Sequence, residues 1–270
     1  MPRITQIRLY PIKSCAGVSV ESARLEPRGF LWDRRYMLVD RHGRFLTQRE
    51  YPKMARILVR KINNGWAIDT EGQETLELPD VPGNGPERTV RIWNDHLELT
   101  VVGKGCNKWF TEALGLPCQL MQMNEQHLRP IKAGRGRAGD LVSLADGAPV
   151  LLTSEASLAA LNDRLENPLQ MGRFRSNLVM DADDAFAEDN WRHIRVGEVE
   201  FDVEWSCTRC IVTTIDPETG LKDSDGEPIR TLKEFRSGSG GVMFGQNLIP
   251  RHLGTVSVGD TIEVLEDIDA

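Results

Sequence analysis

Short runs of β-branched and aromatic residues, separated by turn residues, dominate the first hundred positions of the chain. The run 35–40 ends in a turn at 41–44, and the runs 89–93 and 97–101 are separated by only a few polar residues. Runs of this length with such turns are typical of antiparallel strands. The pattern predicts a mostly β N-terminal half, with strands within 4–12, 17–20, 35–40, 45–47, 57–59, 66–68, 76–78, 89–93 and 97–101.

Helical periodicity is confined to two clear segments. Large apolar residues at helical spacing predict a helix over 107–114. In 154–165 three leucines form one apolar stripe, and Ser154 is a favourable N-cap whose helix start can offer N–H groups to an anion. The alternating run 254–264 predicts a closing hairpin. The fold class is therefore mostly β (α+β) with peripheral helices.

A locally basic segment, 124–140, separates the two halves of this acidic chain. It divides the chain into an N-terminal β-rich domain over 1–123 and a second domain over 141–268, which 270 residues can accommodate. Two interpretations stay open for the segment itself: a solvated linker, or a flap that collects anions over a site. Its cations are Arg129, Lys132, Arg135 and Arg137.

Composition narrows the class of protein. The net charge of −7 argues against direct nucleic-acid binding, and no apolar run is long enough to span a membrane. The N-terminus enters a strand pattern without the apolar stretch of a signal peptide. We therefore expect a cytoplasmic protein without a membrane partner.

Two of the five cysteines, Cys207 and Cys210, form a Cys-x-x-Cys pair. Zinc is disfavoured because the remaining cysteines and the histidines lack ligand spacing. Thiol exchange is disfavoured because the strand-like run 211–215 is a poor start for a helix. Two interpretations remain: one thiolate bound to a soft, high-valent metal in a cofactor, or two small buried residues of a strand.

Cations recur where the predicted strands begin or end. Guanidinium groups bind phosphate bidentately, so these positions suit an anionic ligand, whereas any one of them alone is more simply a solvated charge. They are Lys13, Arg34, Arg35, Arg49, Arg173, Arg175 and Arg209.

The segment 207–220, Cys-x-Arg-Cys-x-x-Thr-Thr-x-Asp-Pro-x-x-Gly, resembles the signature of MOSC-domain proteins, named for the molybdenum cofactor sulfurase C-terminal module. Other segments along almost the whole chain resemble that family in the same order: 11–14, 33–39, 46–49, 153–158, 174–177, 187–191, 244–249 and 258–260. Within the family the chain is similar to bacterial YcbX-type proteins and the mitochondrial amidoxime-reducing component. The resemblance implies an N-terminal β-rich MOSC-N domain packed on a MOSC β-barrel.

The resemblance also implies site residues. Cys210 would be the protein ligand to molybdenum. Alignment on Leu38 and Val39 favours Arg35 over Arg34 as the cofactor contact, and Asp216 is a candidate proton donor by its position. The residues implied to bind the Mo-molybdopterin cofactor are Lys13, Ser14, Arg35, Arg49, Ser154, Arg175, Asn177, Thr208 and Arg209.

The activity that the resemblance implies is molybdenum-dependent reduction of N-hydroxylated compounds such as hydroxylaminopurines and amidoximes, in detoxification. The sequence stops at Ala270 without a cysteine-rich segment, so we expect electrons from a separate ferredoxin- or flavoprotein-type protein. Asn247 stands where the mitochondrial relatives have an aromatic residue. The alternative is a non-enzymatic carrier of the cofactor or its sulfur.

Overall fold

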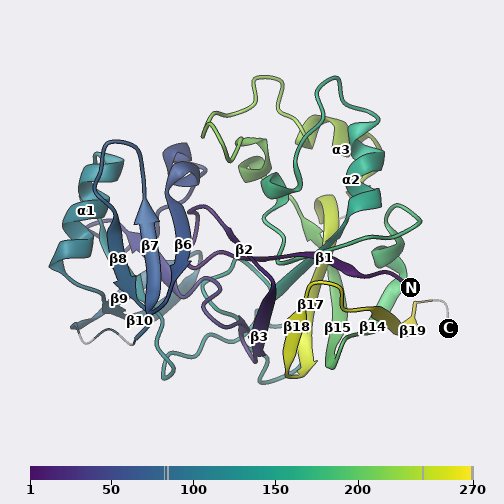
Figure 1. Cartoon of the computed structure of the whole chain (residues 1–270), viewed down its shortest axis with the longest axis horizontal. Helices are drawn as coiled ribbons and strands as arrows, with labels where there is room; N and C mark the ends of the chain where they lie inside the picture. Colours follow the sequence, from purple (N-terminus) through teal and green to yellow (C-terminus); the bar gives the residue numbers. More distant parts are fainter. Residues whose placement is uncertain (82, 84, 239, 269–270) are drawn as a thin grey trace.

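The computed structural model of the chain describes residues 1–81, 83, 85–238 and 240–268. Two β-rich halves lie side by side, and the purple N-terminal strand crosses into the half formed by the C-terminal sequence (Figure 1). Among the described residues, no helix has the length and apolar character needed to cross a membrane. The mostly β fold class is confirmed.

The largest sheet follows the order β19-β14-β15-β17-β12-β13-β1-β2, with β16 paired to β17. The pairings are antiparallel except for β12 with β13. The strands are β1 Ile4–Leu9, β2 Val18–Val20, β12 Val150–Ser154, β13 Leu178–Met180, β14 Trp191–Val196, β15 Val199–Thr208, β16 Ser237–Gly238, β17 Gly241–His252 and β19 Ile262–Asp267. β1 and β2 belong to this sheet although they lie before residue 123. A division of the sequence at residue 123 therefore does not divide the structure into separate sheets.

The other half contains a four-stranded sheet of order β5-β11-β10-β9 and a three-stranded sheet of order β6-β7-β8. Its elements are β5 Tyr36–Val39, β6 Leu58–Ile62, β7 Gly65–Asp69, β8 Leu76–Pro79, β9 Glu87–Ile92, β10 Asp95–Val101, α1 Lys104–Leu114 and β11 Gln119–Gln122. A third small sheet, β18-β3-β4, consists of β3 Ser22–Glu26, β4 Gly29–Phe30 and β18 Thr255–Ser257.

The predicted helices are present. α1 ends in a left-handed Gly115, as the sequence indicates, and α2 (Glu155–Asn162) begins after Ser154, whose hydroxyl accepts a hydrogen bond from the N–H of Ser157 at 3.3 Å. A third helix, α3 (Ile229–Phe235), has no counterpart in the sequence-based expectations.

Three local predictions are wrong. The run 45–47 is not a strand, because only Phe45 forms an isolated bridge, with Val39. The run 254–264 is not a hairpin, because β18 pairs with β3 while β19 pairs with β14. The apolar run after the cysteine pair is a 3-10 helix, Ile211–Thr214, and not a strand. These segments have residue types typical of strands, but whether a segment pairs, and with which partner, is set by distant parts of the chain.

One apolar core joins the halves. Its fully buried side chains include Tyr36 and Trp66 from the N-terminal sheets, and Leu152 and Phe201 from the large sheet. Buried apolar area is the main favourable contribution to folding, so this shared core fixes how the two halves face each other. The relative position of the two halves is therefore fixed by the fold itself.

The basic segment between the halves is anchored to the body of the protein. The Arg129 side chain is buried, and its Nη1 donates to the carbonyls of Ser143 at 3.0 Å and Ala145 at 2.6 Å. Its Nε donates to Asp95 on β10 at 2.8 Å. The segment therefore does not behave as a wholly solvated connection.

Candidate functional site

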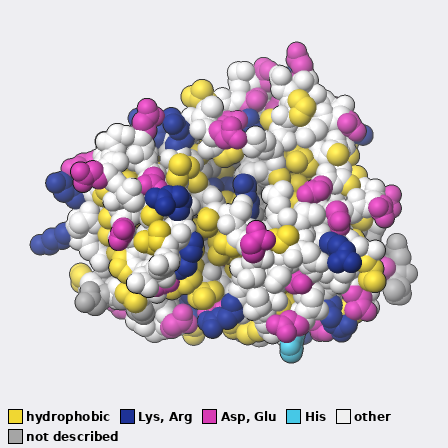
Figure 2. All heavy atoms as spheres, in the orientation of Figure 1, with side chains coloured by type: hydrophobic (Ala, Val, Ile, Leu, Met, Phe, Trp, Pro, Cys, Tyr) yellow, Lys and Arg dark blue, Asp and Glu magenta, His cyan; other side chains and the backbone are white. Residues whose placement is uncertain are grey.

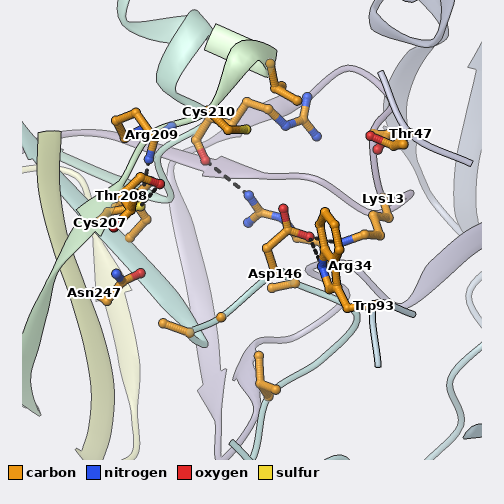
Figure 3. Close-up of a pocket in the computed structure, with 18 of the residues that line it drawn as sticks. Lys13, Arg34, Thr47, Trp93, Asp146, Cys207, Thr208, Arg209, Cys210 and Asn247 are labelled. Carbon is orange, nitrogen blue, oxygen red and sulfur yellow. Dashed lines mark hydrogen bonds and ion pairs between the residues drawn. The ribbon is translucent and has the colours of Figure 1, made fainter. Parts of the chain in front are cut away.

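A cavity of about 600 Å³ lies between the two halves and is lined by residues of both. In the space-filling view the surface is hollowed at this junction, and Lys and Arg atoms are visible inside (Figure 2). The Cys207–Cys210 turn forms one wall, and Lys13, Thr47 and Trp93 lie on the opposite side (Figure 3). Arg49 also lines the cavity.

Each sulfur of the cysteine pair faces a guanidinium group. Cys207 is the second-last residue of β15, and Cys210 directly precedes the 3-10 helix. Arg49 Nη2 donates to the Sγ of Cys210 at 3.0 Å, and Arg209 Nη1 donates to the Sγ of Cys207 at 2.8 Å. Hydrogen bonds from charged donors are stronger than those from neutral donors, so both sulfurs are held in a positively charged environment.

Three cations line the cavity beside the cysteines. Arg34 and Arg175 lie against the ring of Tyr10, each with its guanidinium carbon 4.3 Å from the ring centroid. Burial lowers the pKa of Arg175 to about 10, which leaves it charged at neutral pH. Lys13 donates to the Leu144 carbonyl at 2.7 Å and pairs with Asp146, while burial lowers its pKa to about 8.

Asp146 holds these groups together. Its carboxylate accepts from Lys13 and from the indole N–H of Trp93 at 3.1 Å, and it lies 3.5 Å from Arg49. Burial acts to raise the pKa of Asp146, but the charges of Lys13 and Arg49 outweigh it and lower the pKa far below the usual range. The carboxylate is therefore ionised and orders the cations of this wall.

Backbone strain is concentrated at the cavity. Six non-glycine residues of the described chain have positive φ, and four of them line the cavity: Ser14, Arg34, Trp93 and Arg175. Such conformations cost free energy and persist only where the surrounding structure enforces them, which is common at ligand sites.

Most of the residues predicted from the sequence come together here. The cavity lining includes Lys13, Ser14, Arg49, Arg175, Asn177, Thr208, Arg209 and Cys210. Three predicted residues lie outside it: Arg35, Ser154 and Asp216.

Arg34, and not Arg35, reaches the cavity, which corrects the sequence-based preference. Arg35 is buried on the other side of its strand and pairs with Glu26. Arg34 Nη1 donates to the Oδ1 of Asn177 at 3.0 Å, which joins the two halves of the cavity wall. Arg34 has positive φ at the end of the turn before β5, so the chain changes direction there and sends the two neighbouring side chains to different places.

Ser154 and Asp216 have structural contacts instead. Ser154 is fully buried as the N-cap of α2. Asp216 accepts from the N–H groups of Glu218 and Thr219 at 2.8 and 3.0 Å and pairs with Arg173 at 3.1 Å. Burial acts to raise the pKa of Asp216, but these hydrogen bonds and the Arg173 charge outweigh it and lower the pKa. A carboxylate held ionised outside the cavity is a poor proton donor.

Sequence reasoning missed Asp146 and Trp93 as cavity residues. Asp146 lies in a loop without periodicity, and Trp93 resembled the buried end of a strand. A signal for Trp93 existed, because a two-residue turn in a hairpin favours glycine or asparagine where a tryptophan stands. Among the described residues, no group of three or more His, Cys, Asp or Glu side chains could hold a metal ion.

Fold and cavity together define a β-rich protein with a thiol in a cation-lined cleft between two halves. The family described as the MOSC N-terminal beta barrel domain matches residues 1–117, and the MOSC domain family matches residues 139–263. The chain belongs to the MOSC family, as the sequence motifs indicate. Membership implies a function connected with the molybdenum cofactor.

The similar curated proteins match most of the length of the chain. Mitochondrial amidoxime-reducing component 1 of Homo sapiens is 32% identical over 97% of this chain and 82% of its own length. Molybdenum cofactor sulfurase of Danio rerio is 32% identical over 90% of this chain but only 31% of its own length. Among solved structures, the YUAD protein from Bacillus subtilis covers 97% of this chain and 94% of its own with a TM-score of 0.41 and 9% identity, too low to support an inference.

Proposed function

We propose that this protein is a molybdenum-cofactor-dependent reductase of N-hydroxylated compounds, with Cys210 as the ligand to molybdenum. The observation that carries the proposal is the position of the Cys210 sulfur, which lines the cavity 3.0 Å from Arg49 and opposite a wall of cations. The similarity to the mitochondrial amidoxime-reducing components over nearly the whole chain supports it.

The residues present fit such a cofactor. A thiolate is a suitable soft ligand for molybdenum, and the cations suit its phosphate. Arg209 also has a buried Nε with no hydrogen-bond partner among the described residues, although buried polar atoms are nearly always satisfied. An anionic ligand beside the cysteine turn would give that atom a partner.

The cofactor, when bound, supplies the two-electron reduction of the N–OH group. Cys210 would hold it, and Arg49 and Arg209 position the two sulfurs through their hydrogen bonds. Lys13, Arg34 and Arg175 bind its phosphate, with Asn177 orienting Arg34. The remaining predicted residues that line the cavity, Ser14 and Thr208, contribute polar contacts.

The departing oxygen needs a proton, and we assign the proton to water in the open cavity. Asp216 is excluded from this role by its ion pair with Arg173 and its lowered pKa. Electrons come from a separate ferredoxin- or flavoprotein-type protein, and the substrates are small hydroxylaminopurines or amidoximes. We further propose that the protein works in the cytoplasm in detoxification.

A second candidate function is carriage of the cofactor or its sulfur without catalysis. The match to the molybdenum cofactor sulfurase favours it, because the same family of domains occurs in that longer protein. The carrier would need the same cysteine and cations. It would not need a route for substrate to the metal.

An activity assay of the purified protein loaded with molybdenum distinguishes the two functions. We expect this protein to reduce 6-hydroxylaminopurine with an artificial electron donor. Full molybdenum loading without turnover would exclude the reductase and favour the carrier. Cys210→Ser is expected to lose molybdenum while Cys207→Ser retains it, and metal analysis of both variants checks the ligand. The reverse pattern would move the ligand to Cys207.

A further inference from the structure

Trp93 is a large aromatic residue at the opening of the cavity. It is 42% exposed and lines the cavity from the turn that joins β9 to β10. In Figure 3 its indole lies beside Asp146 and Lys13, across the cavity from the cysteine turn. An exposed tryptophan at a cavity opening leaves apolar ring surface available to a ligand.

The backbone at Trp93 is unfavourable for this residue type. Ile92 pairs with Asp95, so Trp93 and Asn94 form a two-residue turn. Trp93 has φ of 53°, and the first position of such turns favours glycine when only that position has positive φ. A bulky residue in this conformation is strained, which points to a role for the side chain and not for the turn.

Three contacts fix the indole. Its N–H donates to Asp146 at 3.1 Å, and Phe45 meets its edge with the ring centroids 5.0 Å apart. The guanidinium of Arg49 lies over the ring, 4.6 Å from the centroid. The orientation is thus set before a ligand arrives, which lowers the entropic cost of binding.

Arg49 also gives the ring a defined position relative to the sulfur. Its Nη2 lies 3.0 Å from the Sγ of Cys210 while its guanidinium carbon lies over Trp93. One guanidinium group therefore spans the gap between the indole and the thiol. A flat molecule on the part of the indole that Arg49 leaves uncovered lies at the opening of the same cavity that the Cys210 sulfur lines.

We propose that Trp93 is a stacking surface for flat aromatic N-hydroxylated substrates, and that it gives this site a preference for them over N-hydroxylated compounds without a ring. This inference rests on the proposed reductase function. Stacking is tolerant of the pattern of hydrogen-bonding groups on a base, so the preference extends to flat heterocycles as a class. The flat ring of the cofactor has the same chemistry and is the competing occupant of this surface.

The test compares Trp93→Leu, which removes the flat ring, with Trp93→Phe, which keeps one. Trp32→Phe is the matched control, because Trp32 also has positive φ but does not line the cavity. KM is measured for 6-hydroxylaminopurine and for N-hydroxyurea, and the Kd of adenine for the molybdenum-loaded protein is measured by calorimetry. Molybdenum per protein is determined for every variant.

We expect Trp93→Leu to raise the KM for 6-hydroxylaminopurine and the Kd for adenine about tenfold, with the KM for N-hydroxyurea and the molybdenum content unchanged. Trp93→Phe should recover most of the loss. Equal losses on both substrates, or unchanged adenine binding, would overturn the proposal. Loss of molybdenum in Trp93→Leu would overturn the proposal, because it would mean that Trp93 stacks on the ring of the cofactor and not on the substrate. If no substrate is turned over, the reductase function fails and the adenine titration alone decides the stacking.

Discussion

The guanidinium of Arg49 lies 3.0 Å from the sulfur of Cys210, although the two residues are 161 positions apart in the sequence. Arg49 belongs to the N-terminal half and Cys210 to the wall formed after β15. The contact therefore exists only when the two halves are packed together. It couples the chemistry of the thiol to the shared core.

Replacing Arg49 should reduce the reactivity of Cys210. We expect Arg49→Met to slow alkylation of Cys210 by iodoacetamide at pH 7 about three- to tenfold, because the sulfur loses the charged N–H donor that contacts it. Arg49→Lys, which keeps the charge without the planar fork, should lie between. Mass spectrometry of the modified peptide gives the rate at each cysteine. An unchanged rate in Arg49→Met would show that the contact does not affect the thiol.

Arg34 and Arg35 should have separable roles. Arg34→Met is expected to lower the molybdenum content of folded protein about tenfold, because a cation of the cavity wall is lost. Arg35→Met should instead lower the free energy of unfolding by about 3 kcal/mol, since Glu26 is left without its buried partner. Urea titration and metal analysis of both variants check this. Molybdenum loss in Arg35→Met alone would restore the sequence-based assignment.

Lys13 should contribute a characteristic pH dependence of stability. Burial lowers its pKa from 10.5 to about 8, so between these values the unfolded chain binds more protons than the folded protein. Stability from this group therefore rises with pH from about 8 to 10.5. Lys13→Met should remove a rise of about 3 kcal/mol in the free energy of unfolding across this window. Lys104→Met, at an exposed position, is the control. If the free energy of unfolding changes with pH in the same way in the wild type and in both variants, Lys13 is not the source of this pH dependence.

The contribution of Glu188 to stability should change with pH in the direction opposite to that of Lys13. The Glu188 side chain is fully buried, and its carboxylate accepts a hydrogen bond from the Ser157 hydroxyl at 3.0 Å. Burial raises the pKa of Glu188 from 4.5 to about 7. The negative charge of Asp189 also raises this pKa, whereas the positive charge of Arg236 lowers it. Between pH 4.5 and 7 the folded protein binds the extra proton, so stability falls as pH rises through this range.

Glu188→Gln should therefore stabilise the protein by about 2 to 3 kcal/mol at pH 8 and have little effect at pH 5. Thermal unfolding at both values of pH measures the difference. Glu234→Gln on exposed α3 is the matched control and should show no such dependence. A stabilisation of equal size at both values of pH would mean that Glu188 stays in one protonation state.

Much of the fold could be predicted from local pattern. The strands around 36–39 and 97–101 and the helix capped by Ser154 depend on residues close in sequence, so alternation, spacing and capping identify them. The closing hairpin could not be predicted correctly, because β18 and β19 have the residues of paired strands but find partners in different sheets. Pairing is a long-range choice decided by the packing of the whole core.

By itself the sequence determined the family and the chemical type of the site: a cysteine turn accompanied by cations, in an ordered series of motifs. Only the tertiary structure decided which side chains enter the cleft. In the folded protein Arg34 lines the cavity and Arg35 does not. Asp216 lies outside the cavity in an ion pair with Arg173. Trp93 and Asp146 both line the cavity and are hydrogen-bonded to each other. The physical reason is that side-chain direction and proximity depend on strand register and on the packing of two halves, which no short stretch of sequence contains.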